Sequence, residues 1–533
     1  MTTPLQHFRQ KGLVEQIQSL EDVKKLPAAE ILPELYDLFI HRLKDSTIDY
    51  MVGMTLREIL GSNEEAAVTG LRHDHPEIRR LCIQICGQKC FEKAIPLLSE
   101  LMSRQPEDSL RRELLVAMSQ LQSNEFLKIF KEHMDCPQED LAALAIETAG
   151  RYNDPDVIAK LMALLDDGET DERYMACDIR TGAAIEALGR MADKRVLGYL
   201  VSKLHYRNPT GRLMVHRALT SHGAAVIPFL GNIFEGDDVD AKIMAANIIG
   251  MIGEKSGGEL LIQAADRGLL NNPNVKYAAY EAFGRIPFMK GIVFLMDGLS
   301  ETDPLILTAV LASMENQVNP GVIKKIQEKI LQDETTRELL VQAIVRSKSM
   351  KIFEQLYADA RLAPVLINGI RTIKEPSIIA AFRQKLSEMP QETALRDAEA
   401  LSTVSSTRFD RKILASDDSK AMLAFYRTTI AAMGFEVVTT ENGREAMDKI
   451  HGGDEFVMIL TDMNMPVMDG IEFTRQARSH EGSRQTPIIM ITTESESSQV
   501  KLAGHAGVNG FLTKPFTADQ LRAKIAEYIR ITE

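Results

Sequence analysis

The feature that most constrains this chain is a helical pattern that returns along most of its length. Each copy begins at an acidic, Asn or Pro residue, continues as a helix rich in Ala, Leu and Ile, and often ends in Gly. The copies occupy residues 76–87, 108–119, 140–150, 179–189, 240–250, 274–284, 303–314 and 336–346. Their ends are mostly roughly 29 to 39 residues apart, which is room for two short helices and two turns. The pattern therefore predicts a stacked helical array, an α-solenoid.

The copy at residues 274–284 shows how such a helix would pack. Apolar groups recur every three or four residues, which gives the helix one buried stripe. Ala278, Ala279 and Ala282 would let neighbouring helices approach closely. We expect Gly284 to end the helix, because glycine readily takes the left-handed conformation found at helix C-termini.

These copies resemble HEAT repeats, particularly the short variety of bilin lyases. The resemblance rests on the period, on the small residues and on the paired arginines Arg79–Arg80 and Arg111–Arg112. It covers residues 49–389 and implies an architecture rather than one function. Tetratricopeptide repeats are the competing interpretation, but this chain lacks their constant period and aromatic signature. Residues 1–48 are predicted to form a helical N-terminal cap.

The pattern changes after Pro390. Residues 390–410 contain one possible helix and a polar, β-branched stretch, which predicts a linker. From residue 411 to 533, strand-like and helix-like segments alternate five times. The predicted strands are 412–416, 436–440, 456–461, 487–491 and 510–513, and the predicted helices are 420–433, 443–450, one from 471, one near 498–505 and one from 517. Five such units predict an α/β doubly wound, five-stranded parallel sheet with helices on both faces.

Acidic and cationic residues follow the predicted strands at their carboxyl ends. Asp417 and Asp418 follow the first strand, Asp462 the third and Lys514 the fifth, while Thr492 ends the fourth. In such sheets the carboxyl ends of the strands line the ligand crevice. Three carboxylates gathered there would raise one another's pKa values unless a cation lay among them. Because the ligands are oxygens, the residues predict Mg²⁺.

Four segments resemble the signature blocks of response-regulator receiver domains, in the family's order and spacing. They read ILASDD at 413–418, LTDMNMPVMDG at 460–470, ITT at 491–493 and KPF at 514–516. The resemblance implies a flavodoxin-like receiver fold and a phosphoacceptor at Asp462. It also implies that Asp417, Asp418 and the backbone carbonyl of Asn464 hold Mg²⁺ with Asp462.

The same resemblance gives roles to the remaining signature residues. The hydroxyl of Thr492 would bond the phosphoryl group and Lys514 would pair with it electrostatically. Phe511 occupies the aromatic switch position. Asn464 and Glu494 are similar to the pair in the fast chemotaxis regulator, which implies a short-lived phosphoryl group. Thr493 replaces the small residue usual in the family, which leaves that lifetime open.

Each of these residues has a simpler interpretation when taken alone. Asp417–Asp418 could be a helix cap, Lys514 a solvated charge, Thr492 an ordinary strand residue and Phe511 a packing residue. Their joint occurrence at the ends of the predicted strands favours the receiver site.

A second cluster near the N-terminus could be drawn as a metal site. Cys82, Cys86 and Cys90 recur every four residues, with His73 and His75 upstream. Four-residue spacing places thiols on one helical stripe, where Cys behaves as a small apolar residue. We favour that structural interpretation, because the spacing fits no zinc-finger pattern.

The chain as a whole is predicted to be a bacterial, cytoplasmic response regulator of a two-component phosphorelay. Its phosphodonor would be a sensor histidine kinase or a phosphotransfer protein, and the solenoid would bind an unidentified protein partner. It is not expected to be an enzyme beyond its own phosphorylation and dephosphorylation. The net charge of −13 argues against nucleic-acid binding, and no stretch is apolar enough for membrane insertion. The alternatives are a receiver-gated enzyme of the bilin-lyase type and a passive scaffold.

Overall fold

The computed structural model describes residues 3–170, 177–206, 208–373, 376–402, 411–465, 467–492, 503–514 and 516–529. Contacts divide the chain into two compact units. Unit 1 is Met1–Thr170 with Asp178–Met191, and unit 2 is Ala192–Glu533 with Asp171–Cys177.

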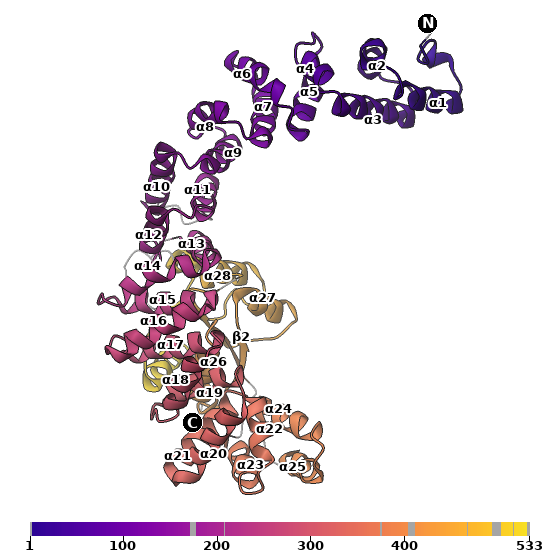
Figure 1. The fold of residues 1–533 in the computed structure, drawn as a ribbon. Coiled ribbons are helices and arrows are strands. Elements are labelled where there is room, and N and C mark those ends of the chain that lie inside the picture. The colour runs from indigo at the N-terminus through magenta and orange to yellow at the C-terminus, as the bar shows by residue number, and fades with distance from the viewer. Residues whose placement is uncertain are drawn as a thin grey trace. The chain divides into compact units, whose positions relative to one another are not determined.

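Unit 1 is a run of paired helices (Figure 1). Helices α3, α5, α7, α9 and α11 pack consecutively against one another, and α1 and α2 pack on α3. The helices are α1 Leu13–Val23, α2 Ala28–Ile40, α3 Ser46–Ser62, α4 Glu64–Gly70, α5 Pro76–Gln88, α6 Ile95–Ser103, α7 Asp108–Leu121, α8 Leu127–His133, α9 Glu139–Ala149, α10 Pro155–Thr170 and α11 Ile179–Gly189. Short 3₁₀ helices are Phe8–Gln10, Glu92–Ala94, Asn124–Phe126 and Gly150–Tyr152.

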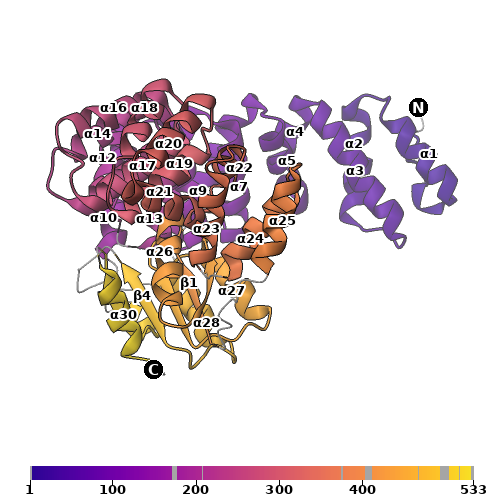
Figure 2. The ribbon, with the colours of Figure 1, turned by 90° about the horizontal axis from the view of Figure 1, so that it is seen from below.

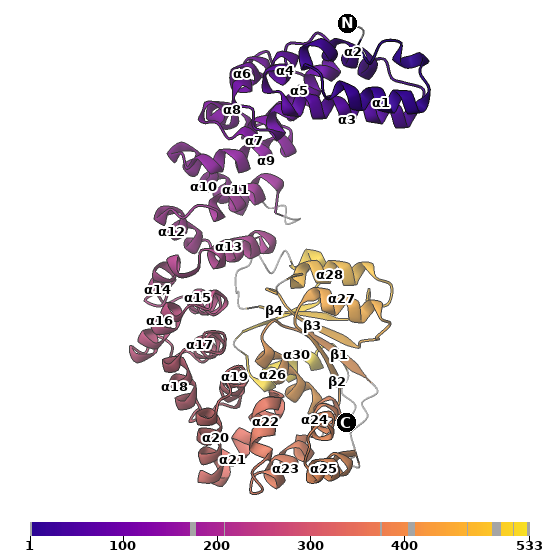
Figure 3. The ribbon, with the colours of Figure 1, turned by 45° about the vertical axis from the view of Figure 1, so that its right-hand side comes forward.

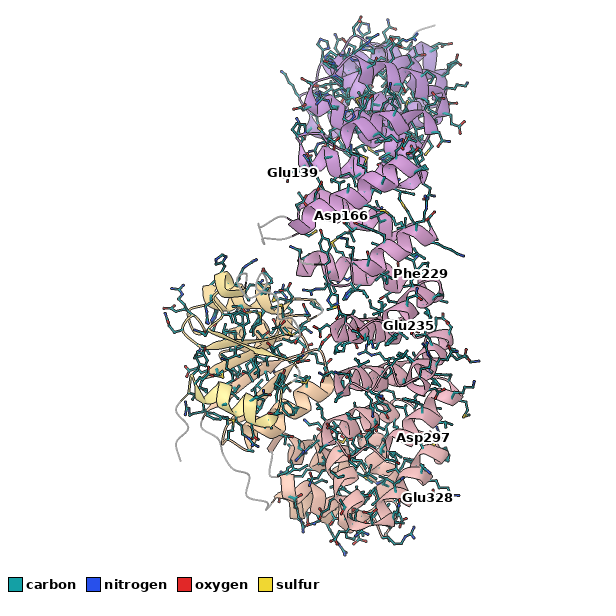
Figure 4. All side chains as sticks on the ribbon, turned by 90° about the vertical axis from the view of Figure 1, so that its left-hand side faces the viewer. Glu139, Asp166, Phe229, Glu235, Asp297 and Glu328 are labelled. Atoms are coloured by element: carbon teal, nitrogen blue, oxygen red, sulfur yellow. The ribbon has the colours of Figure 1, made fainter. Side chains whose placement is uncertain are left out.

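The helices of unit 2 up to residue 373 form two rows (Figure 3). The inner row is α13 Pro209–Ser221, α15 Val239–Ile252, α17 Pro273–Arg285, α19 Pro304–Glu315, α21 Glu334–Arg346 and α23 Ala363–Ile373. The outer row is α12 Lys194–Ser202, α14 Ile227–Ile233, α16 Lys255–Asp266, α18 Met289–Gly298, α20 Pro320–Gln332 and α22 Met350–Tyr357, after which come α24 Pro376–Ser387 and α25 Glu392–Ser402. Phe229, Asp297 and Glu328 mark the outer row in Figure 4. A 3₁₀ helix, Gly223–Ala225, precedes α14.

The predicted α-solenoid is confirmed, and each predicted copy coincides with one helix: α5, α7, α9 and α11 of unit 1, and α15, α17, α19 and α21 of unit 2. The sequence search missed α13, which fills the double-length gap between the copies at 179–189 and 240–250. This helix was missed because its middle carries Arg212, His216 and Arg217 in place of the small residues of the other copies.

The repeat glycines have a different role from the one expected. Gly284 lies inside α17 and is not among the described glycines with positive φ. A Cβ at Gly284 would lie 2.7 Å from the Cβ of Ser313 on α19, and one at Gly250 would lie 2.8 Å from the Cα of Ala282 on α17. These distances are too short for any side chain, so the glycines let consecutive inner-row helices touch rather than ending them.

The C-terminal part of unit 2 is a five-stranded parallel sheet, as the sequence predicts, and its strands lie in the order β2-β1-β3-β4-β5. The strands are β1 Lys412–Ser416, β2 Glu436–Thr440, β3 Met458–Asp462, β4 Ile488–Thr492 and β5 Gly510–Thr513. The helices are α26 Lys420–Ala431, α27 Gly443–His451, α28 Gly470–Ser479 and α30 Ala518–Ala526.

The two faces of the sheet bury different side chains because neighbouring strand residues point in opposite directions. Ile413 and Ala415 of β1 pack with α26 and α30, whereas Leu414 packs with α27 and α28. Figures 2 and 3 show the strands between these two helix layers. The strand order changes direction between β1 and β3, so the carboxyl ends of these two strands border the crevice of the fold.

Some predictions fall on residues outside the described ranges. These are Thr493, Glu494 and most of the helix near 498–505. The predicted linker at 390–410 contains α25, and residues 403–410 lie outside the described part. Among described residues, no helix combines the length and apolar character needed to cross a membrane.

Candidate functional site

Asp462, the last residue of β3, lies at the centre of the crevice and is 6% exposed. Its Oδ1 accepts a hydrogen bond of 2.6 Å from the Lys514 ammonium, and its Oδ2 accepts one of 2.9 Å from the backbone N–H of Asn464. Gly470 closes the loop behind it, where a Cβ would come within 2.1 Å of the Asp462 carbonyl oxygen. Gly470 is therefore required by this close backbone approach, in addition to the turn that the Asp469–Gly470 pair favours.

Asp417 lies directly after β1 and is fully buried. The hydrogen bonds described for its carboxylate all come from the same domain. The N–H of Ser419 donates to Oδ1 at 3.0 Å, and the Tyr426 hydroxyl and the Lys514 ammonium donate to Oδ2 at 3.0 and 2.9 Å. Lys514 thus bridges Asp417 and Asp462, which stand on the adjacent strands β1 and β3.

The electrostatics of the site are those of carboxylates in excess of cations. Burial raises the pKa of Asp462 to about 6, against the opposing effect of Lys514. Burial, followed by the charges of Asp417 and Asp462, raises the pKa of Asp418 well above its usual range. By its accessible surface Asp418 is exposed, so the charges of Asp417 and Asp462 are the firmer cause of this rise; Asp418 lines the same cavity as Asp462 and Lys514. Burial alone would lower the pKa of Lys514, but Asp417 and Asp462 outweigh it and raise that pKa.

The donor set fits a hard divalent cation, since three carboxylates share one lysine and all ligands are oxygens. In the arrangement described, Lys514 lies between two of these carboxylates. Over the described ranges, no three His, Cys, Asp or Glu side chains are already gathered as a metal site. The metal ligands assigned to Asp417, Asp418, Asp462 and Asn464 therefore stay predictions.

Thr492 and Phe511 lie beside this crevice rather than in it. The Thr492 hydroxyl is buried and donates to the Met463 sulfur at 3.7 Å. Phe511 is partly buried and packs with Met463, Ile471 and Met490. The Asn464 side chain has a buried Oδ1 without a protein partner, at the rim of the acceptor. The roles predicted for these three residues are untested by this arrangement.

The cysteine cluster is packed as expected for apolar side chains. Cys82 and Cys86 are buried in α5, and burial raises the pKa of each thiol to about 12. Cys90 is exposed and lies beyond the end of that helix, with φ of 53°.

Sequence reasoning missed several residues at the site. Tyr426 lies on α26, and its spacing of nine residues from Asp417 was the available signal. Tyr277 and Glu281 come from the repeat helix α17, and Arg212 from α13; all three line the same cavity as Asp462 and Lys514. The sequence signal for Tyr277 and Glu281 was their i,i+4 spacing on α17.

Comparison with known proteins agrees with this geometry. Residues 413–526 match the response regulator receiver domain family, and residues 64–145 match HEAT repeats. The chain is 38% identical over 115 residues to chemotaxis protein CheY1 of Helicobacter pylori, covering 21% of this chain and 93% of that protein. It is 37% identical over 115 residues to chemotaxis protein CheY of Pseudomonas aeruginosa, covering 21% of this chain and 92% of that one.

A solved structure of the chemotaxis response regulator CheY4 of Vibrio cholerae is 35% identical, covers 22% of this chain and 98% of its own, and has a TM-score of 0.22. The relatives are matched over nearly their whole length by the C-terminal part of this chain alone. This chain therefore belongs to the response-regulator family, with its receiver domain in that C-terminal part and HEAT repeats before it.

Proposed function

We propose that Asp462 accepts a phosphoryl group with the help of Mg²⁺, and that the chain passes this signal on through protein contacts of its HEAT repeats. The donor is the phosphohistidine of a sensor kinase or phosphotransfer protein. The chain carries out no other enzymatic reaction. The observation that supports the proposal is the Lys514 ammonium, which bridges the acceptor carboxylate and Asp417 at the carboxyl ends of three parallel strands.

The residues divide the work of the transfer. One Oδ of Asp462 forms a bond to phosphorus as the P–N bond to the donor imidazole breaks, and the imidazole keeps the electron pair and takes up a proton. Lys514 and the N–H of Asn464 hold the carboxylate in place. Asp417, Asp418, Asp462 and the Asn464 carbonyl would hold Mg²⁺, which supplies positive charge to the phosphoryl oxygens.

The test is phosphorylation of the full chain by acetyl phosphate with Mg²⁺, followed by mass spectrometry. We expect one added phosphoryl group in the wild type and none in Asp462→Asn. Asp448→Asn is the matched control, because Asp448 is an exposed aspartate on α27 of the same domain. Equal labelling of the wild type and Asp462→Asn would contradict the proposal.

A further inference from the structure

Helix α17 of the repeats carries two polar side chains to the receiver. The Tyr277 hydroxyl lies 3.0 Å from the Ser419 hydroxyl and donates to the Glu281 carboxylate at 3.2 Å. Ser419 begins α26 and donates its N–H to Asp417, a predicted metal ligand. One hydrogen-bonded path therefore runs from the repeat helix to the acidic site, and α19 also packs against α26.

Charged groups of the repeats and of the receiver line the contact at two places. Burial raises the pKa of Glu281 on α17 to about 7, and Arg285 of the same helix opposes this effect most; among the charges of the receiver, Asp417 adds to the rise and Lys514 opposes it. Burial is also the chief cause that raises the pKa of Asp469 of the receiver. The charge of Arg212 on α13 opposes that rise.

The repeats and the receiver together line a cleft of about 540 Å³ that is partly open to solvent. Its walls come from α13, α15, α17 and α19 on one side, and from Asp418, Asp462, Asn464 and Lys514 on the other. That volume suits a small molecule. A phosphohistidine carried on a helical domain is too large for this volume. A helix with its side chains is about 10–12 Å wide, and three turns of it fill on the order of 1000 Å³.

We propose that the repeat helices α13 to α19 dock on the receiver and cover the cleft of its phosphoacceptor, so that small acyl phosphates enter the cleft and a phosphohistidine carried by a protein does not. The inference rests on the proposed function, because it assumes that Asp462 is the acceptor. The interaction surface is the polar contact at Tyr277 with the flanking charges of Glu281 and Arg212. A protein phosphodonor reaches Asp462 only after this contact opens.

The experiment compares two phosphodonors on the full chain. One is acetyl phosphate, and the other is the phosphorylated histidine-phosphotransfer domain of a chemotaxis kinase. Tyr277→Ala removes the contact while leaving a good helix former in α17. We expect transfer from the protein donor to be at least about tenfold faster in Tyr277→Ala than in the wild type, which corresponds to loss of a contact of about 1.4 kcal/mol. The initial rate of labelling by acetyl phosphate should change by less than about twofold.

A matched pair of milder variants separates docking from general damage to α17. Tyr277 bonds Ser419 of the receiver, whereas Tyr280, one turn along the helix, bonds Glu301 within the repeats at 3.1 Å. Tyr277→Phe should raise the rate of transfer from the protein donor, and Tyr280→Phe should leave it at the wild-type value. Equal rates from the protein donor in the wild type, Tyr277→Phe and Tyr277→Ala would overturn the proposal.

Hydrogen exchange measures the docking without any donor. Amides of residues 415–425 and 273–285 should exchange faster in Tyr277→Ala than in the wild type, while those of β4 stay unchanged as a folding control. Identical exchange in both proteins would overturn the docking. The proposed function fails in a different way, by the absence of labelling from acetyl phosphate in every variant, so the two failures are distinguishable.

Discussion

At the scale of single residues, the site is governed by the balance between three carboxylates and one ammonium. Lys514 contacts Asp417 and Asp462 directly, and Asp418 has no cation of its own among the contacts described. The excess negative charge is what a bound Mg²⁺ would neutralise. Protons and Mg²⁺ should therefore compete at this site.

We expect the rate of Asp462 phosphorylation by acetyl phosphate to depend on pH. The pKa of Asp462 is raised to about 6, so the nucleophilic carboxylate is mostly protonated at pH 5 and mostly ionised at pH 7. At the lowest Mg²⁺ concentration that supports labelling, the initial rate should rise about tenfold between these pH values. Raising Mg²⁺ should move the midpoint to lower pH, because the cation favours the ionised form. A midpoint pH that does not change with Mg²⁺ concentration would refute this competition.

The sequence predicted correctly which residues come together where the topology of the sheet decides their positions. The strand order brings the ends of β1 and β3 together, so Asp417, Asp462 and Lys514 were expected to converge, and they do. Tyr277 and Glu281 could not be placed in this way. Tyr277 is 142 residues from Ser419 in sequence, and no local pattern reports a contact over that distance.

At the scale of the elements, consecutive repeat helices of both units are spaced by their smallest residues. Gly87 faces Ala117, Gly150 faces Ala187, Gly250 faces Ala282 and Gly284 faces Ser313. The repeat period and the glycine positions were visible in the sequence. Their purpose was misjudged, because a glycine near a helix end satisfies the pattern for a C-cap and for a close helix contact equally well.

Gly284→Ala should destabilise the contact between α17 and α19. The new Cβ would lie 2.8 Å from the Cα of Ser313, so the two helices must separate, at a cost of about 1–3 kcal/mol. We expect faster hydrogen exchange in both helices under native conditions, which avoids assuming two-state unfolding of a repeat protein.

Two further variants control this prediction. Ser313→Gly in the Gly284→Ala background should restore part of the protection, since it removes the side chain but leaves the Cα. Gly12→Ala should leave α17 and α19 unaffected, because a Cβ at Gly12 meets no atom within 4 Å. Unchanged exchange in Gly284→Ala would show that the array tolerates wider spacing.

At the scale of unit 2, phosphorylation and docking should be coupled reciprocally. A phosphoryl group adds about −1.5 to −2 charges, and it would lie in the cleft that Glu281 and Asp418 also line. Occupancy of Asp462 should therefore weaken the contact at Tyr277. By thermodynamic linkage, loss of the contact should strengthen binding at Asp462 by the same factor.

Beryllofluoride, which mimics the phosphoryl group, offers a direct measurement. We expect it to accelerate hydrogen exchange in α17 of the wild type and to have no further effect in Tyr277→Ala. The variant should also bind beryllofluoride at least about fivefold more tightly than the wild type. Equal affinities would mean that docking and occupancy are independent.

The contact between Tyr277 and Ser419 joins two segments of one chain, so the receiver remains tethered when the contact opens. A tethered partner typically meets its surface at an effective concentration in the millimolar range. Recapture after dephosphorylation would then be fast and independent of how much protein the cell makes. Any other molecule that binds the exposed face of the repeats must compete with this effective concentration of the receiver. Signalling is therefore restricted to partners that bind tightly or to a phosphoryl group that is long-lived.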